Sequence, residues 1–369
     1  MSENIPISVP DLSGREAEYV HECVKSGWVS SIGPFVARFE REFAAFCRVG
    51  FGVSVNSGTA ALHLALRALG VGPGDEVIIP GLTFASTANC IIYQGGVPVF
   101  ADCARDDWNM DADALEKLIT ERTAAIVPVH LYGSPCEMQR IMAIADAYSI
   151  PVVEDCAEAH GAQYRNARVG SFGRISCFSF YGNKIITTGE GGMCVTADPE
   201  LDGRLRFLRD HGMSKTRRYW HDEIGFNYRM TNLQAAVGCA QLERIQDFID
   251  KKRWIADEYR EQLEGSGLNL PKEDVHTYSV YWLYTVILPA ELGQRQRDEL
   301  IQRLAEHGID ARPVFYPLTQ MPPYRAYETA LPNSESLSAR GVTLPSFYTL
   351  GRPQIRRITG ALLDWLAEQ

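Results

Sequence analysis

The sequence predicts an α/β protein in which a large domain holds a mostly parallel sheet and a smaller α+β domain follows it. Between about residues 50 and 212, short apolar runs alternate with amphipathic stretches, which is typical of a parallel sheet covered by helices on both faces. The chain has 369 residues, more than a single domain usually contains. Its 46% hydrophobic and 22% charged residues are ordinary for a globular protein.

Each element of the large domain is predicted from its pattern of apolar residues. Short apolar runs predict strands, and longer stretches with apolar residues at helical spacing predict the helices between them. The predicted strands are Gly52–Val55, Glu76–Ile79, Val97–Ala101, Ala124–Val129, Pro151–Glu154, Ile175–Phe180 and Met193–Thr196. The predicted helices are Thr59–Leu69, Ala85–Tyr93, Asp111–Ile119 and Met138–Tyr148.

A long helical stretch, Thr231–Leu263, is predicted to bridge the two domains, because its apolar residues recur near helical spacing. We place the domain boundary near residue 245, which gives a large domain of residues 1–245 and a small domain of residues 246–369. The small domain is predicted from the apolar segment 281–288, a helix near Arg295–His307, the segment 308–315 and a terminal helix, Gln354–Glu368.

Charge and cysteine content exclude several classes of protein. The net charge of −10 predicts no general attraction to nucleic acid or to anionic lipid. The nine cysteines contain no C-x-x-C pair, so we expect reduced thiols in the core rather than disulfides or a zinc site. The first twelve residues lack a secretion signal, and no apolar run approaches the ~20 residues of a membrane span. A soluble, cytoplasmic protein without membrane or nucleic-acid partners is expected.

The most informative residue is Lys184, in the run FSFYGNKIITTGEGGM (178–193). It follows one apolar strand and precedes another, and a lysine between buried strands must reach water or take part in chemistry. Asp155 ends a further apolar strand, where parallel sheets place functional groups. A lysine and an acid at strand ends suit a pyridoxal phosphate site, in which the lysine forms a Schiff base and the carboxylate keeps the pyridine nitrogen protonated. Such a lysine must have a pKa well below about 10.4.

A phosphate site is suggested by Ser57-Gly58-Thr59, which follows an apolar strand and opens a predicted helix. Backbone amides at a helix N-terminus bind anions, and Gly58 permits close approach of the backbone. Taken alone, each of these motifs has a structural alternative. Lys184 could lie in a solvated turn, Asp155 could cap the following helix, and the tripeptide S-G-T is common.

These runs resemble the DegT/StrS family of sugar-nucleotide aminotransferases, and the resemblance covers nearly the whole chain. It extends to the segments VNSGTAALHLAL (55–66), IPVVEDCAEAHG (150–161), GFNYRMTNLQAA (225–236), PDLSGREAEYVHECVKSGWVSSIG (10–33), RPVFYP (312–317) and MPPY (321–324). The resemblance implies the fold-type-I aminotransferase fold, with a seven-stranded sheet that contains one antiparallel strand.

The family resemblance also assigns roles to individual residues. Lys184 and Asp155 are the catalytic pair. Asn227 is expected to reach the cofactor phosphate of the neighbouring subunit, which implies a homodimer with shared active sites. Ala157 and Phe84 lie against the two ring faces, and Glu158 stands near the phenolic oxygen, where many relatives carry glutamine. The other expected cofactor-binding residues are Gly58, Thr59, Ser179 and Asn183.

The resemblance further implies the reaction and its partners. We expect amino transfer from L-glutamate to C4 of a nucleotide-linked 4-keto-6-deoxy sugar, with GDP-4-keto-6-deoxy-D-mannose favoured. The product is expected to enter a surface polysaccharide such as the O-antigen of lipopolysaccharide. Arg229, Arg312 and Tyr316 are candidate substrate-binding residues, although Arg229 could equally form a structural salt bridge. Relatives often carry a histidine just after the RPVFYP motif, where this chain has Leu318-Thr319-Gln320.

Other functions remain open to different degrees. The acceptor could be a UDP- or dTDP-linked 3- or 4-keto sugar, or the protein could be a non-catalytic regulator that binds pyridoxal phosphate. Related sugar dehydratases replace the lysine with histidine, so Lys184 favours amino transfer. A nicotinamide enzyme is disfavoured because neither glycine cluster (70–76 or 189–192) has G-x-G-x-x-G spacing. The eight histidines show no metal-binding pair, so no metal site is predicted.

Overall fold

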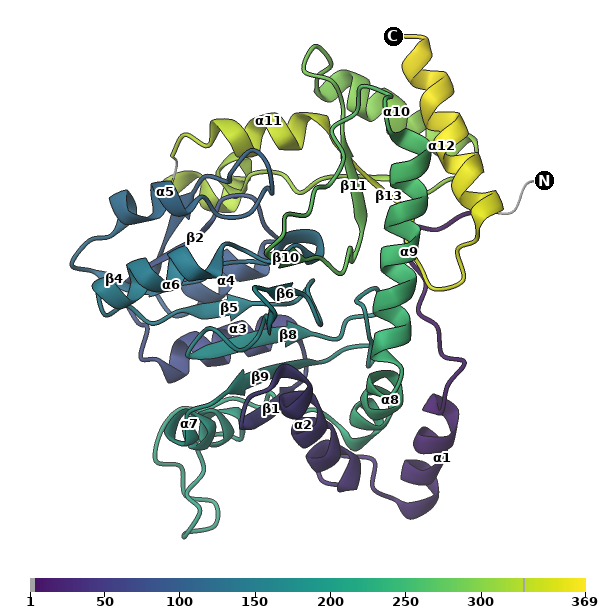
Figure 1. Ribbon diagram of the computed structural model, residues 1–369. Coiled ribbons are helices and arrows are strands. Elements are labelled where there is room, and N and C mark those ends of the chain that lie inside the picture. The colour runs from purple at the N-terminus through teal and green to yellow at the C-terminus, as the bar shows by residue number, and fades with distance from the viewer. Residues whose placement is uncertain (1–3, 328) are drawn as a thin grey trace.

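The computed structural model describes residues 4–327 and 329–369, and its centre is a seven-stranded sheet with helices on both faces (Figure 1). The strand order is β3-β2-β4-β5-β8-β9-β1, in which isolated parallel bridges at Ile126–Val152 and Val129–Asp155 join β4 to β5. The bounds are β1 Phe51–Val55, β2 Glu76–Pro80, β3 Val97–Ala101, β4 Thr123–Ile126, β5 Val153–Asp155, β8 Ile175–Ser179 and β9 Gly192–Thr196.

Strand direction agrees with the expected fold. Strand β9 runs antiparallel to both β8 and β1, whereas β3, β2, β4, β5 and β8 are mutually parallel. The mostly parallel sheet with one antiparallel strand is therefore confirmed. All seven predicted strands are present, with ends shifted by at most a few residues.

Helices cover the sheet because alternate side chains of each strand point to opposite faces. On β8, Ile175 and Cys177 belong to the core beneath α3, while Phe178 belongs to the core beneath α2 and α8. The helices of this part are α1 Glu16–Ser26, α2 Pro34–Cys47, α3 Gly58–Ala68, α4 Ser86–Ile92, α5 Ala112–Leu115, α6 Met138–Ala147 and α7 Pro199–Arg209. The predicted helix 111–119 is shorter than expected, since α5 gives way to a 3-10 turn at Glu116–Leu118.

The long bridging stretch is two helices, not one. Helix α8 (Asn232–Leu242) begins with a capping box between Thr231 and Gln234, and α9 (Ile245–Leu263) follows after a break. The break falls at Arg244, whose φ of −114° is not helical and whose side chain binds Asp11 at 2.8 Å. The apolar spacing continues across this break, which is why the sequence predicts a single helical stretch.

The C-terminal part has its own three-stranded antiparallel sheet, in the order β11-β13-β12. Helix α9 borders this sheet (Figure 1) and supplies Tyr259 and Leu263 to its core. Ile5, near the N-terminus, packs in the same core, and its backbone N–H donates a hydrogen bond to the Gly308 carbonyl. The sequence did not predict this arrangement. The elements are β11 Tyr284–Ile287, α10 Gln294–Glu306, β12 Arg312–Pro313, α11 Pro332–Arg340, β13 Gly341–Leu344 and α12 Arg352–Ala367; a second small sheet joins β10 Thr277–Tyr278 to β6 Gln163–Tyr164 and β7 Ala167–Arg168.

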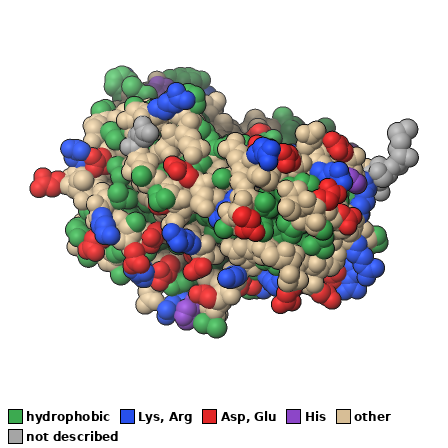
Figure 2. Space-filling model, turned by 90° about the horizontal axis from the view of Figure 1, so that it is seen from above, with side chains coloured by type: hydrophobic (Ala, Val, Ile, Leu, Met, Phe, Trp, Pro, Cys, Tyr) green, Lys and Arg blue, Asp and Glu red, His purple; other side chains and the backbone are tan. Residues whose placement is uncertain are grey.

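The surface and the cysteines agree with the composition. Acidic and basic side chains are interspersed over the face seen in Figure 2. All nine cysteines are buried and unpaired, which confirms the expected free thiols. Over the described residues, none of the helices has both the length and the apolar character needed to span a membrane.

Candidate active site

Lys184 lies in the turn after β8, and its side chain is only 12% exposed. Its Nζ stands 3.7 Å from Oε1 of Glu158 and 3.8 Å from the centre of the Trp282 ring. Burial lowers the pKa of Lys184, and the nearby carboxylates of Glu158 and Asp155 oppose that shift. A lysine that must attack an aldehyde as a neutral amine requires a lowered pKa.

Asp155 ends strand β5 and is buried, as a strand-end functional group in a parallel sheet would be. The Thr87 hydroxyl donates to Oδ2 at 2.9 Å, and the Ala157 N–H donates to Oδ1 at 3.1 Å. Burial raises the pKa of Asp155, while these two donors and the charge of Lys184 act in the opposite direction. Each oxygen of the Asp155 carboxylate therefore accepts a hydrogen bond, and the two bonds together fix its orientation.

Glu158 is the second buried carboxylate beside Lys184. Its Oε2 accepts the backbone N–H of Tyr132 at 2.8 Å. Burial raises its pKa to about 7, although the charge of Lys184 acts against that shift. Glutamine at this position would carry no proton that titrates, so glutamate gives this site an additional group that changes charge near neutral pH.

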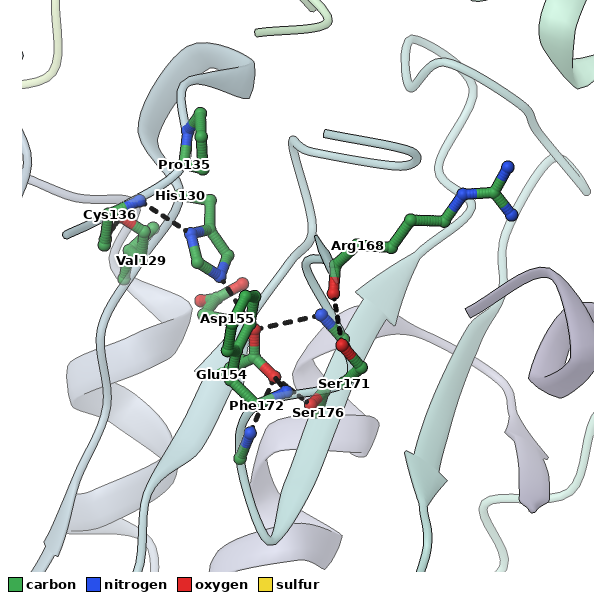
Figure 3. Close-up of polar contacts among 12 residues, drawn as sticks. Val129, His130, Pro135, Cys136, Glu154, Asp155, Arg168, Ser171, Phe172 and Ser176 are labelled. Carbon is green, nitrogen blue, oxygen red and sulfur yellow. Dashed lines mark hydrogen bonds and ion pairs between the residues drawn. The ribbon is translucent and has the colours of Figure 1, made fainter. Parts of the chain in front are cut away.

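A network of hydrogen bonds supports the strand that carries Asp155 (Figure 3). Glu154 accepts bonds from the backbone N–H groups of Gly170, Phe172 and Gly173, the Ser176 hydroxyl and Nε2 of His130, at distances of 2.7 to 3.1 Å. Potential ligand atoms of His130, Glu154 and Cys156 lie within 4.8 Å of one another. Because both Glu154 oxygens already accept hydrogen bonds, we interpret this group as structural support rather than a metal site.

The turn from β1 into α3 brings backbone amides close to the end of β8. Ser57 caps α3 by accepting the Ala60 N–H at 3.1 Å, and Gly58 and Thr59 form its first turn. A Cβ added at Gly58 would lie 2.7 Å from Cβ of Ser179. The absence of a side chain at Gly58 therefore allows the helix N-terminus and Ser179 to share one small space, where an anion can be bound.

An aromatic row beside Lys184 was not predicted from the sequence. Trp282 stacks on Tyr132 at a centroid distance of 6.1 Å, and Tyr132 stacks on Phe315 at 5.3 Å. The predicted Phe84 lies at the exposed end of the row, 6.0 Å from Phe315. Tyr132 and Trp282 occur in apolar runs that look like ordinary core, and no local signal distinguishes them.

Asn183, next to Lys184, was expected in the cofactor site. Its carbonyl oxygen accepts the Trp282 Nε1–H at 2.6 Å. Its side-chain oxygen is buried and has no hydrogen-bond partner among residues 4–327 and 329–369. A buried acceptor of this kind needs a partner, and a bound ligand can supply one.

Asn227 and Arg229 lie next to the Ser57 turn, because Val55 and Arg229 form a β-bridge. The guanidinium of Arg229 donates to Oδ1 of Asn227 at 3.0 Å and pairs with Asp210 at 2.9 Å. The salt bridge considered for Arg229 is therefore present, and its side chain is one-third exposed.

Arg312 and Tyr316 lie on the C-terminal part. Arg312 pairs with Asp310 at 3.2 Å and is largely exposed, and the Tyr316 hydroxyl accepts from Arg297 at 3.2 Å. Within the described ranges, no direct contact joins either residue to Lys184 or Asp155. Their neighbour Phe315 does belong to the aromatic row, so the RPVFYP segment borders the site.

The assembled residues fit pyridoxal phosphate. A buried lysine of lowered pKa, an oriented carboxylate, an amide cradle opened by Gly58 and an unpartnered Asn183 oxygen match the groups that this cofactor offers. The structure brings together four of the predicted residues, Lys184, Asp155, Ala157 and Glu158. It also places the Thr87 hydroxyl within hydrogen-bonding distance of Asp155.

Comparison with known proteins agrees with this geometry. Residues 10–363 match the DegT/DnrJ/EryC1/StrS aminotransferase family. The chain is 44% identical over 365 residues to a GDP-perosamine synthase of Escherichia coli O157:H7, with 99% of both proteins covered. It is 46% identical over 361 residues to a GDP-perosamine synthase of Caulobacter vibrioides, with 97% of both covered. A Streptococcus pneumoniae sugar aminotransferase solved in its PLP form matches with a TM-score of 0.94 at 29% identity, covering 99% of each chain. The chain belongs to the DegT/DnrJ/EryC1/StrS aminotransferase family.

Proposed function

We propose that this aminotransferase uses pyridoxal phosphate to move the amino group of L-glutamate to C4 of GDP-4-keto-6-deoxy-D-mannose, forming GDP-perosamine. The observation that carries the proposal is the near full-length identity of 44% and 46% to two proteins named GDP-perosamine synthase. The site geometry supports amino transfer independently, because Lys184 and Asp155 are buried together at strand ends.

Lys184, Asp155 and the α3 turn hold the cofactor. Asp155 would accept the N–H of the cofactor ring, and Ala157 and Phe84 would lie beside it. The remaining residues that would hold the cofactor are Gly58, Thr59, Ser179 and Asn183. When bound, the cofactor supplies a ring that withdraws electrons from the carbon bearing the amino group. Asp155 stays oriented for this role because Thr87 and Ala157 each donate to one of its oxygens.

Lys184 moves the proton. Its Nζ would take up the proton from the carbon that bears the glutamate amino group and hold it for the return transfer, and the same atom would serve in the half-reaction with the sugar. Burial lowers the pKa of Lys184, which favours the neutral amine that can accept a proton. The Trp282 face excludes water from one side of Nζ.

Glu158 adjusts the charge around Lys184. When Lys184 carries a proton and Asp155 and Glu158 are both ionised, the three groups have a net negative charge, and protonation of Glu158 brings them to neutrality. Its pKa of about 7 places this change near neutral pH. With Glu158 protonated, the positive charge of Lys184 and the negative charge of Asp155 balance each other.

The active unit is a homodimer with shared sites. Asn227 contacts the cofactor phosphate of the partner subunit, and Arg229 binds anionic groups of the substrate. Support comes from the exposed position of Asn227 and its segment beside the phosphate turn. Arg312 and Tyr316 line the substrate entrance. The enzyme acts in the cytoplasm, and its product is used for the O-antigen of lipopolysaccharide.

The test separates the two half-reactions. Purified enzyme is converted to its amine form with L-glutamate, the excess is removed, and GDP-4-keto-6-deoxy-D-mannose is added. Return of the visible cofactor band together with a 4-amino sugar detected by mass spectrometry is the expected result. Return only with UDP- or dTDP-linked keto sugars would replace the acceptor but keep the enzyme class. Failure with every donor and acceptor would favour a regulatory protein.

A further inference from the structure

Lys252, on helix α9, is a buried cation outside the set of residues assigned above. It is 7% exposed, and its Nζ donates to the Trp282 carbonyl at 2.9 Å, to the Ser346 hydroxyl at 3.1 Å and to the Ser346 carbonyl. Across the part of the chain that the structure describes, no carboxylate forms a salt bridge with it. Burial lowers the pKa of Lys252 to about 7.

A buried ammonium without a counter-charge is unfavourable for stability. Methionine has a similar length and would fill the same space without the desolvation cost. The three hydrogen bonds of Lys252 offset that cost, and in return they fix three segments that are far apart in sequence. These segments are α9, the chain leading into β11, and the chain after β13.

Trp282 transmits this support to the active site. Its carbonyl is held by Lys252, its Nε1–H donates to the Asn183 carbonyl at 2.6 Å, and its ring lies 3.8 Å from Nζ of Lys184. Tyr132 stacks on the same ring at a centroid distance of 6.1 Å. Lys184 and Lys252 also line one small cavity, so the two lysines lie in the same part of the molecule.

We propose that Lys252 and Trp282 are positioning residues for amino transfer: Lys252 fixes the backbone of Trp282, and Trp282 fixes both the backbone before Lys184 and the direction of its amine. When the Lys184 amine is protonated, its cation–π contact with the ring adds to the ion pair with Glu158 in orienting it. Through the contact of Trp282 with Lys184, the C-terminal part of the chain helps to position the catalytic lysine.

The test compares Lys252→Met and Trp282→Phe with matched controls on the same helix. Lys251 lies over the ring of Trp254 at 3.7 Å, which gives a second lysine–tryptophan pair remote from Asn183, and Lys251→Met and Trp254→Phe are the controls. The holoenzymes are mixed with L-glutamate, and the single-turnover change of the visible band is followed. The pH midpoint of that band is measured without substrate.

We expect the two test variants to react about tenfold or more slowly at saturating glutamate, since a small misplacement of a reacting group has effects of this size. Their half-saturating glutamate concentration should change by less than about twofold, because no glutamate contact is removed. Their band midpoint should shift, and the controls should match the wild type in all three measurements. Uptake of pyridoxal phosphate by the cofactor-free variants should also slow.

Test variants that melt lower but keep the wild-type band midpoint and turnover rate would overturn the proposal, leaving Lys252 a purely structural role. If Lys252→Met does not fold, Trp282→Phe and Ser346→Ala still decide the question, because each removes a single bond of the same chain of contacts. The inference rests on amino transfer but not on the identity of the sugar. A wild type that does not react with glutamate would refute the proposed donor, while the band midpoints would still report on Lys252.

Discussion

Lys184 shows how its surroundings prepare a common side chain for chemistry. Water is excluded by burial, two carboxylates stand nearby, and an aromatic face covers Nζ on one side. Burial makes the neutral amine accessible, and the carboxylates prevent its pKa from falling further. The carboxylate of Glu158 stands 3.7 Å from Nζ, slightly beyond hydrogen-bonding distance.

Replacement of this amine tests its role directly. We expect Lys184→Ala to lose turnover by about a thousandfold or more, because the substitution removes the amine that moves the proton. Pyridoxal phosphate should still bind noncovalently, held by the Gly58 turn and Asp155. The measurement is the spectrum and turnover of the gel-filtered variant. Substantial residual amino transfer would show that Lys184 does not move the proton.

The pKa of Glu158 leads to a test by stability. Its folded pKa of about 7 exceeds the ordinary value of 4.5, so between these pH values the folded state binds more protons than the unfolded state. Stability therefore falls as pH rises from about 4.5 to 7, by up to roughly 3 kcal/mol. Glutamine cannot titrate. Cofactor-free Glu158→Gln should consequently gain stability relative to the wild type at pH 8 compared with pH 5.

Urea unfolding at the two pH values measures this difference, and the cofactor must be absent because binding adds its own stability. Glu291→Gln is a suitable control, since Glu291 is exposed. An equal effect of Glu158→Gln at both pH values would mean that Glu158 is ionised throughout this range.

At the scale of secondary structure, the site depends on where elements begin and end. Helix α3 begins immediately after β1, and the one glycine at this junction lets Ser179 approach the helix N-terminus. Strand β5 likewise ends at Asp155, which places the carboxylate at the C-terminal end of a central strand. These junctions were predictable because apolar runs stop abruptly where functional residues start.

Gly58→Ala should weaken cofactor binding by about tenfold or more while leaving the fold intact. The added Cβ would lie 2.7 Å from Cβ of Ser179, so α3 or β8 must shift and the phosphate cradle opens. The matched control is Gly203→Ala inside α7, where a Cβ would meet nothing within 4 Å. That variant should bind cofactor normally and gain about 0.5–1 kcal/mol from helix propensity. Cofactor dissociation constants and urea unfolding provide the two measurements, and equal affinity of both variants would exclude this cradle.

At the scale of the whole molecule, distant parts of the chain meet at one site. The C-terminal part contributes Trp282 and Phe315 to the aromatic row, and the N-terminal Ile5 packs in the C-terminal core. Hydrophobic clusters also join the two parts, since Trp282 and Val314 pack in the same core as Phe178 of the sheet. This shared core holds the aromatic cover over Lys184 in place.

The shared-site homodimer can be tested by mixing two inactive variants. If Asn227 acts in the partner's site, a hybrid of Lys184→Ala and Asn227→Ala chains contains one intact site. Random exchange of subunits should then restore roughly a quarter of wild-type activity. Restoration requires that each variant alone be nearly inactive and dimeric by light scattering. If Asn227 acts within its own chain, mixing restores nothing.

The sequence by itself determined the strands and most helices of the large sheet, and it placed Lys184, Asp155 and Gly58 at strand ends and turns. Burial periodicity is a local property, so an apolar run and its end can be read directly. Only the tertiary structure decided that Trp282 covers Lys184, that Lys252 holds Trp282, and that the bridging stretch breaks at Arg244. The reason is physical: apolar spacing tells which side chains are buried, whereas the partners of a buried side chain depend on how distant segments pack together.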